Sequence, residues 1–157
     1  MARKERERLI ARLREHGFKL TPQRQAIIEL LEERGHYSAE DIYKRLQQDY
    51  PMLSRATVYN TLEVLKELGE VAELKIKPNI VLYDPETEPH YHFFCRRCGK
   101  VVDVEPLPEC DPEELPARLT AGPLRGYKIE GMEVYIYGLC PRCRRPSSRM
   151  ASSGEGI

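Results

Sequence analysis

The chain has 157 residues, of which 41% are hydrophobic, and its 25 basic and 25 acidic side chains give a formal net charge of zero. This length suits one domain or two small ones, and no apolar run is long enough to span a membrane. The first fifteen residues alternate in charge and contain no hydrophobic secretory core, so we expect a cytoplasmic protein without a signal peptide.

The N-terminal stretch is predicted to form an amphipathic helix. Leu9, Ile10, Leu13 and Phe18 recur at helical spacing, and Gly17 is placed to end the helix. Six basic side chains stand against two acidic ones over the first fourteen positions. Such a basic face can contact phosphate groups, or it can simply be solvated.

The next two predicted elements are helices with recognisable N-terminal signals. Thr21 followed by Pro22 is typical of an N-cap and a first helical position, and predicts a helix over residues 22–34 that stops at Gly35. Residues 38–41, Ser-Ala-Glu-Asp, predict the capped start of a third helix, which should end near Asp49.

A fourth helix is predicted over residues 55–68, capped by Ser54 and followed by Gly69. Its apolar positions share one face. The opposite side of its first half carries residue types that contact phosphates, thymine methyl groups and base edges in helix-turn-helix proteins. These candidate DNA-binding residues are Arg55, Ala56, Thr57, Tyr59 and Asn60.

Residues 71–76 and 80–83, joined by a turn at 77–79, predict a β-hairpin. Short helices followed by a hairpin are typical of a winged helix, so residues 1–84 are expected to form a DNA-binding domain for double-stranded DNA. The alternative is a generic helical module in which Arg55 and Asn60 are merely solvated.

The second half begins after a predicted linker at residues 85–89, which contains two prolines and two acidic residues. Beyond it, a periodicity of two predicts strands over residues 90–95, 101–104 and 132–139. Asp111 and Pro112 are expected to start a modest helix that runs through Leu119. The apolar face of the last strand suits either a core or a partner subunit. The serine- and glycine-rich residues 146–157 should form a disordered tail.

Two Cys-x-x-Cys pairs, separated by 41 residues, predict a tetrahedral structural Zn2+ site formed by Cys95, Cys98, Cys140 and Cys143. Side chains alternate along a strand, so His90 and His92 should face away from Cys95 and belong to a different metal site. Because the domain is small, the zinc would bind its beginning to its end. Cys110 lies alone and is read as an incidental thiol rather than a redox group.

Four motifs of the sequence, taken together, resemble those of a known protein family. The chain contains Thr-Pro-Gln-Arg at 21–24, Ala-Thr-Val-Tyr at 56–59, His-x-His-x-x-Cys-x-x-Cys-Gly at 90–99 and Tyr-Gly-Leu-Cys-Pro-x-Cys at 137–143. Over residues 5–143 it resembles the ferric uptake regulator family of bacterial metal-dependent repressors. The resemblance implies an α+β protein with an N-terminal winged helix-turn-helix domain and a small C-terminal α/β dimerisation and metal-binding domain at residues 90–145. It also implies a homodimer that binds palindromic operators when its regulatory metal is present.

The resemblance further implies a regulatory metal site. Its ligands would be imidazole nitrogens and carboxylate oxygens, which suit Fe2+ or Mn2+. A set of three histidines and two aspartates looks like the regulatory site of the peroxide-responsive branch of the family. Iron-responsive members more commonly have glutamate at the two aspartate positions. The chain departs from a frequent family pattern at Gly131, where a histidine often stands, so no further ligand is expected there. The implied ligands are His36, Asp84, His90, His92 and Asp103.

The expected function is that of a metal-dependent transcriptional repressor that senses peroxide through Fe2+-catalysed oxidation of a ligating histidine, His36 or His90. The alternative is an iron-, manganese- or zinc-responsive repressor of metal uptake genes. A zinc-ribbon interaction module is a further reading. A metal hydrolase or oxygenase is disfavoured because the sequence has no His-Glu-x-x-His helix and no nucleophile elbow, so we expect no enzymatic activity.

Overall fold

The computed structural model describes residues 3–33, 35–77 and 79–145, and it divides into two compact units, Met1–Glu88 and Pro89–Ile157. Its mixture of helices and sheets agrees with the predicted α+β class. Among the residues described, no helix combines the length and the apolar character that a membrane crossing requires. The predicted tail at 146–157 and Pro78 of the predicted turn lie outside the described residues.

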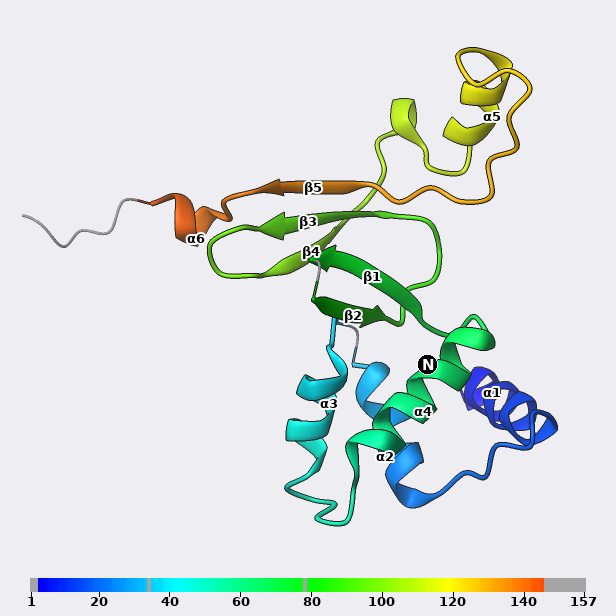
Figure 1. Cartoon of the computed structure of the whole chain (residues 1–157), viewed down its shortest axis with the longest axis vertical. Helices are drawn as coiled ribbons and strands as arrows, with labels where there is room; N and C mark the ends of the chain where they lie inside the picture. The colour runs from blue at the N-terminus through cyan, green and yellow to red at the C-terminus, as the bar shows by residue number, and fades with distance from the viewer. Residues whose placement is uncertain (1–2, 34, 78, 146–157) are drawn as a thin grey trace, which may run out of the picture. The chain divides into compact units, whose positions relative to one another are not determined.

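The first unit contains the predicted helices in their expected order (Figure 1). They differ from the predictions mainly in length. The helix expected to continue to residue 34 ends at Leu31, because the amide of Glu33 already bonds to the carbonyl of Leu30 in a tighter turn. The bounds are α1 Arg3–Glu15, α2 Pro22–Leu31, α3 Ala39–Leu46 and α4 Arg55–Glu67.

Local capping explains where three of these helices begin. The Thr21 hydroxyl accepts a bond from the amide of Arg24 at 3.3 Å, and the Ser54 hydroxyl accepts one from the amide of Thr57 at 3.0 Å. Ser38 and Asp41 form a reciprocal capping box with both bonds at 3.1 Å. Each cap satisfies amide groups that have no partner within the helix.

The core of the first unit lies where the four helices meet. The side chains that are almost completely excluded from solvent come from every helix, and they follow the apolar spacing seen in the sequence. They include Leu13, Ile27, Ile42, Val58, Leu62 and Leu65. The amphipathic faces expected from the sequence therefore point into one shared core.

The hairpin of the first unit consists of β1 Ala72–Lys77 and β2 Ile80–Asp84, paired antiparallel. A second pairing joins it to the segment before α3, because Tyr37 and Tyr83 exchange backbone bonds of 3.2 and 2.8 Å. Four helices followed by this hairpin make the winged helix that the sequence predicted.

Helix α1 is held to the rest of its unit by apolar and ionic contacts. The guanidinium of Arg6 donates to both carboxylate oxygens of Glu32, at 3.0 and 2.5 Å. Arg12 pairs with Glu70 and donates to the carbonyl of Leu68. Arg6 and Arg12, two members of the basic N-terminal face, thus bind carboxylates of their own unit.

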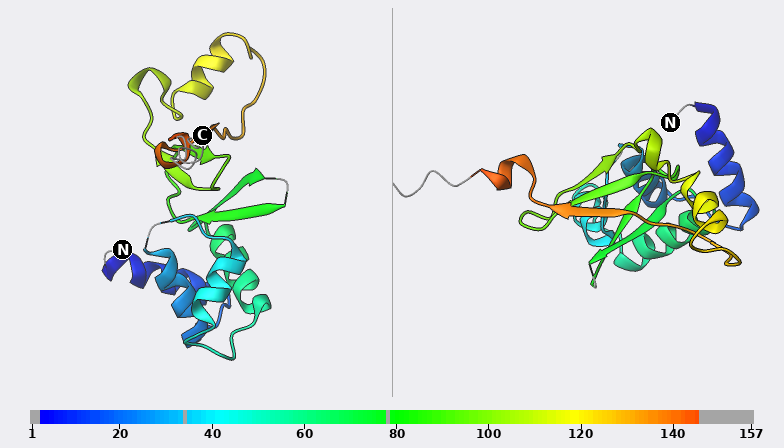
Figure 2. Two further views of the ribbon diagram at one scale, coloured as in Figure 1. Left: turned by 90° about the vertical axis from the view of Figure 1, so that its left-hand side faces the viewer. Right: turned by 90° about the horizontal axis from the view of Figure 1, so that it is seen from above.

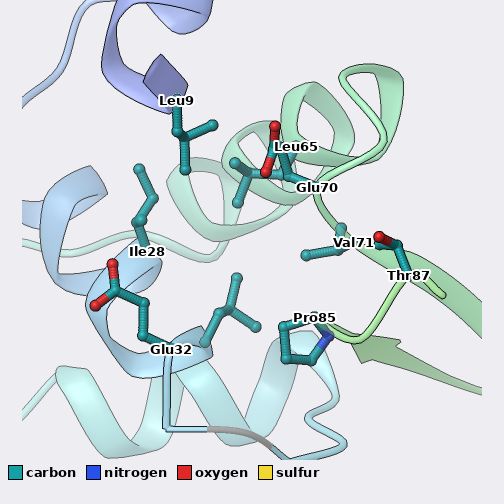
Figure 3. Close-up of a pocket in the computed structure, with 9 residues that line it drawn as sticks. Leu9, Ile28, Glu32, Leu65, Glu70, Val71, Pro85 and Thr87 are labelled. Carbon is teal, nitrogen blue, oxygen red and sulfur yellow. The ribbon is translucent and has the colours of Figure 1, made fainter. Parts of the chain in front are cut away.

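A cavity of about 100 Å3 lies between α1, α2, α4 and the segment after β2 (Figure 3). Leu9 of α1 points toward it from one side, and Val71 and Pro85 border it on another. Glu32 and Glu70, whose carboxylates bind the α1 arginines, are also lining residues.

The second unit is built on a three-stranded sheet with the order β4-β3-β5. Strands β3 and β4 run antiparallel, whereas β5 runs parallel to β3 along its other edge (Figures 1 and 2). The elements in chain order are β3 Tyr91–Cys95, β4 Val101–Val104, the 3-10 turn η1 Pro108–Cys110, α5 Leu115–Ala121, β5 Tyr135–Gly138 and α6 Pro141–Arg144.

Two predicted elements of this unit have other bounds in the structure. The helix expected from Pro112 begins at Leu115, because the Asp111 side chain accepts a bond from the amide of Glu113 and closes a turn first. The last strand was expected over residues 132–139, but only Tyr135–Gly138 lie in ladder register with β3. Helix α6 was not predicted.

Candidate metal centres and nucleic-acid interface

The four cysteines of the two Cys-x-x-Cys pairs are brought together by the parallel pairing of β3 and β5. Cys95 ends β3 and lies in register with Gly138 at the end of β5, so the second pair follows directly beside the first. The turn after Cys95 is closed by a bond of 2.9 Å from the amide of Gly99 to the carbonyl of Cys95. Gly99 has a φ of 75°, a conformation that glycine adopts without strain.

The sulfur atoms form a compact cluster. One sulfur from each cysteine lies within 4.8 Å of the others, and Cys98 Sγ is 3.8 Å from Cys140 Sγ. Four sulfurs at about 2.3 Å from a tetrahedral Zn2+ would lie about 3.8 Å apart. The cluster suits a structural zinc ion, as the sequence predicted.

Hydrogen bonds and burial shift the acidity of these thiols in different directions. The amide of Cys140 donates to Cys95 Sγ at 3.3 Å and, with the amide of Cys98, lowers the pKa of Cys95 to about 6. The amide of Lys100 lowers the pKa of Cys98. Desolvation, followed by hydrogen bonds to the neighbouring cysteines, raises the pKa of Cys143 to about 12. A bound divalent cation would favour the thiolate form of every ligand, including Cys143.

Two further groups of possible ligands combine imidazole with carboxylate, and the first lies in the winged-helix unit. His36 Nε2 is 3.4 Å from Asp84 Oδ2, and both side chains are buried. Asp84 ends β2, and the Tyr37–Tyr83 pairing places the residue before Tyr37 beside the residue after Tyr83. The second carboxylate oxygen of Asp84 accepts a bond of 2.8 Å from the amide of Glu86.

The other group lies on the sheet of the second unit. His90 Nε2 and His92 Nε2 are 3.3 and 3.7 Å from the same carboxylate oxygen of Asp103, and the two imidazole rings are 4.3 Å apart. His92 and Asp103 are register partners on β3 and β4. Cys95 belongs to the separate sulfur cluster, as the alternation along the strand predicted.

The chemistry of the imidazole and carboxylate groups fits a regulatory Fe2+ or Mn2+. Both ions accept nitrogen and carboxylate ligands, whereas the soft thiolates of the cysteine cluster suit zinc. The sequence therefore separated the two kinds of donor in the same way as the structure does. Gly131, where a histidine was noted as missing, contributes no side-chain ligand.

Helix α4 presents its predicted contact residues on the side away from the core. Val58, Leu62 and Leu65 are buried, while Arg55, Ala56, Tyr59 and Asn60 are exposed. Thr57 is half-buried, and its hydroxyl lies 2.9 Å from the capping hydroxyl of Ser54. Four of the five candidate residues are thus open to a ligand, and Thr57 contributes to the helix cap as well.

Sequence reasoning missed two neighbours of this surface. Glu40 and Tyr43 of α3 both contact the guanidinium of Arg55. Their spacing on one helix is visible in the sequence, but nothing in it shows that α3 brings them to the start of α4.

Comparison with known proteins agrees with this geometry. The model of the ferric uptake regulator family matches residues 15–137. The peroxide operon regulator of Bacillus subtilis is 39% identical over 146 residues, which are 92% of this chain and 97% of that protein, and the peroxide-responsive repressor PerR of Staphylococcus aureus is 38% identical over 141 residues, or 89% and 92%. The crystal structure of the Campylobacter jejuni peroxide stress regulator has a TM-score of 0.66 at 29% identity, and the match covers 86% of this chain and 98% of that one. Because the family model matches most of the chain and these relatives are 38–39% identical over nearly their full length, this chain belongs to the ferric uptake regulator family.

Proposed function

We propose that the protein is a metal-dependent, DNA-binding transcriptional repressor that senses peroxide through Fe2+-catalysed oxidation of a ligating histidine. The observation that carries this proposal is the donor set of three histidines and two aspartates, in a chain 38–39% identical to proteins named for peroxide regulation. Nitrogen and carboxylate donors hold Fe2+ without the thiolates that would favour zinc.

The imidazole and carboxylate groups of the two units are assigned to one regulatory ion. His36 with Asp84 supplies two ligands, and His90, His92 and Asp103 supply three. Together they offer five nitrogen and carboxylate donors, the kinds of ligand that suit Fe2+ or Mn2+. An ion that needs both groups stabilises the arrangement in which they meet, so metal and operator affinities must rise together if that arrangement binds DNA.

Peroxide sensing follows from what the ligands lose on oxidation. If bound there, Fe2+ would supply the redox chemistry by which one peroxide molecule transfers one oxygen atom to a ligand imidazole and leaves as water. The imidazoles of His36 and His90, which are 8% and 12% exposed, each lie within 3.4 Å of a carboxylate oxygen and are assigned as the oxidised ligands. An imidazole that gains an oxygen atom ligates poorly, and the operator-binding arrangement loses its support. Mn2+ supports the same arrangement without this chemistry.

The remaining roles are architectural or recognitional. A zinc ion held by four cysteines has no open coordination position, so the cysteine cluster is assigned to structure. Residues 1–84 are assigned to DNA binding and residues 90–145 to dimerisation and metal binding. The proposed assembly is a cytoplasmic homodimer whose two α4 helices enter successive major grooves of a palindromic operator. No enzymatic activity is proposed.

Mass spectrometry of the full chain tests the peroxide assignment. Protein loaded with Fe2+ and treated with modest peroxide is expected to gain 1 oxygen atom, about 16 mass units, on the peptide that contains His36 or His90, and to lose operator affinity in proportion. The Mn2+-loaded protein, given the same peroxide, is the matched control and should keep both its mass and its affinity.

The same experiment separates the proposal from the alternative repressor of metal uptake genes. Full operator binding after peroxide, with unmodified histidines in the iron-loaded protein, would remove the peroxide assignment. Operator binding that rises with metal would still stand and would then favour the metal-uptake alternative.

A further inference from the structure

The first residue of α4, Arg55, is held in place by two side chains of α3. Its Nε and Nη2 atoms donate to the two carboxylate oxygens of Glu40, both at 2.9 Å. Its Cζ atom lies 4.1 Å from the centre of the Tyr43 ring. The Arg55 side chain is 57% exposed, so its guanidinium is held on one side and accessible to solvent on the other.

The residues that hold Arg55 are themselves well anchored. Tyr43 is buried in the core, and its hydroxyl accepts a bond of 2.7 Å from Gln47. Glu40 lies in the first turn of α3, whose start is set by the Ser38–Asp41 capping box. Hydrogen bonding to Arg55 lowers the pKa of Glu40, so the carboxylate stays charged. A planar guanidinium held in this way loses less conformational entropy when it binds a second partner.

The geometry of the pair decides which part of Arg55 remains for DNA. Glu40 engages the edge of the guanidinium formed by Nε and Nη2. The second edge, formed by Nη1 and the outer N–H of Nη2, is not the edge that Glu40 engages. Two parallel donors of this kind match the O6 and N7 acceptors of guanine in the major groove, which is the commonest specific contact of arginine.

We infer that Glu40 and Tyr43 pre-orient Arg55 to read a guanine at the start of the recognition helix. This inference rests on the proposed DNA-binding function and adds to it a base and a positioning residue, Glu40. It differs from two other roles of the same contacts. Arg55 could bind a phosphate, which carries no sequence information, or Glu40 could compete with DNA for Arg55.

Base preference measured with the full Mn2+-loaded chain tests the inference. The preferred sequence of the wild-type protein is first selected from random duplex DNA, and affinities are then measured for duplexes that differ at single base pairs. Arg55→Lys keeps the charge but loses the two-pronged donor. It is expected to reduce discrimination at one guanine position by about tenfold to a hundredfold, with smaller changes elsewhere.

Glu40→Gln should reduce discrimination at the same guanine position. Because it removes a negative charge next to DNA, affinity for unrelated sequence is expected to stay equal or to rise. Glu33→Gln is the matched control, since Glu33 makes an exposed pair of 2.5 Å with Arg45 of α3 rather than with a residue of α4. It should leave base preference unchanged. Thermal unfolding of each variant checks that the fold is retained.

Two other results would contradict the inference. If Arg55→Lys weakens all duplexes to the same extent, Arg55 is a phosphate ligand and the inference is wrong. If Glu40→Gln strengthens operator binding and keeps discrimination, Glu40 is a competitor and the inference is also wrong. Failure of the wild-type protein to select any sequence would instead overturn the proposed function on which the inference rests, so the two failures are told apart.

Discussion

At the cysteine cluster, the residues differ in how readily they ionise, and this difference bears on what zinc must do. The pKa of Cys143 is raised to about 12 by desolvation and by the neighbouring cysteines, whereas hydrogen bonds from amides lower that of Cys95 to about 6. Without a cation, Cys143 is therefore protonated at neutral pH. A coordinated thiol is deprotonated, so zinc binding must displace the proton of Cys143.

Replacement of Cys143 by serine tests the structural role of this site. We expect Cys143→Ser to abolish stoichiometric zinc binding and to lower the Tm on the order of 10 °C, because the ion joins the end of β3 to the segment after β5. Metal analysis and calorimetry measure both effects. Cys110→Ser, the same chemical change outside both Cys-x-x-Cys pairs, is the control and should retain zinc. A Cys143→Ser protein that keeps one zinc and its Tm would contradict the assignment.

Among the elements, α1 illustrates how a basic surface can serve the fold. The Arg6 guanidinium donates two hydrogen bonds to the Glu32 carboxylate. Hydrogen bonding to Glu32 raises the pKa of Arg6. Glu32 is only 14% exposed and borders the cavity under α1, whereas Glu29, which lies 3.6 Å from Arg6, is 45% exposed. The less exposed carboxylate should contribute more, because solvent and salt screen it less.

Hydrogen exchange of the α1 amides is the measurement that ranks these two contacts. Glu32→Gln removes the charge from the two-pronged pair, so we expect severalfold faster exchange in α1 with little change in α4. Glu29→Gln is matched in chemistry and should have a smaller effect. If α1 exchanges in both variants at the rate of the unchanged protein, the apolar contacts of Leu9 and Leu13, rather than the Arg6–Glu32 pair, hold α1 in place.

At the scale of the whole molecule, the central proposal is that one ion links the ligands of two units. His36→Ala removes a ligand from the winged-helix unit and His92→Ala removes one from the other unit. Each is expected to eliminate the rise in operator affinity on addition of Mn2+, which for coupled sites is typically about fivefold to 150-fold. Both proteins should retain zinc, because the cysteine cluster is separate.

His16→Ala is the control for these variants, since the exposed His16 after α1 belongs to neither ligand group. Titration of operator binding with Mn2+ at constant zinc measures the coupling. A normal Mn2+ response in one variant and a lost response in the other would mean that the two ligand groups do not share an ion.

Local sequence rules determined much of this molecule. The caps at Thr21, Ser38 and Ser54 act on amides only three residues away, so the starts of α2, α3 and α4 could be predicted from the sequence. Alternation along β3 likewise separates the histidines from Cys95, because successive side chains of a strand point to opposite faces. The spacing of the two Cys-x-x-Cys pairs predicted the four-cysteine cluster, because structural zinc restricts ligand type and spacing, whereas the three histidines and two aspartates were implied by the family resemblance.

Tertiary structure alone decided the features that depend on residues distant in the chain. The length of β5 follows from its register with β3, and that parallel pairing also places the second Cys-x-x-Cys beside the first. The contacts of Glu40 and Tyr43 with Arg55 exist only because α3 packs against the start of α4. Periodicity and capping are set within a few residues, whereas strand pairing and side-chain contacts between elements depend on the packing of the whole unit, which no short stretch of sequence specifies.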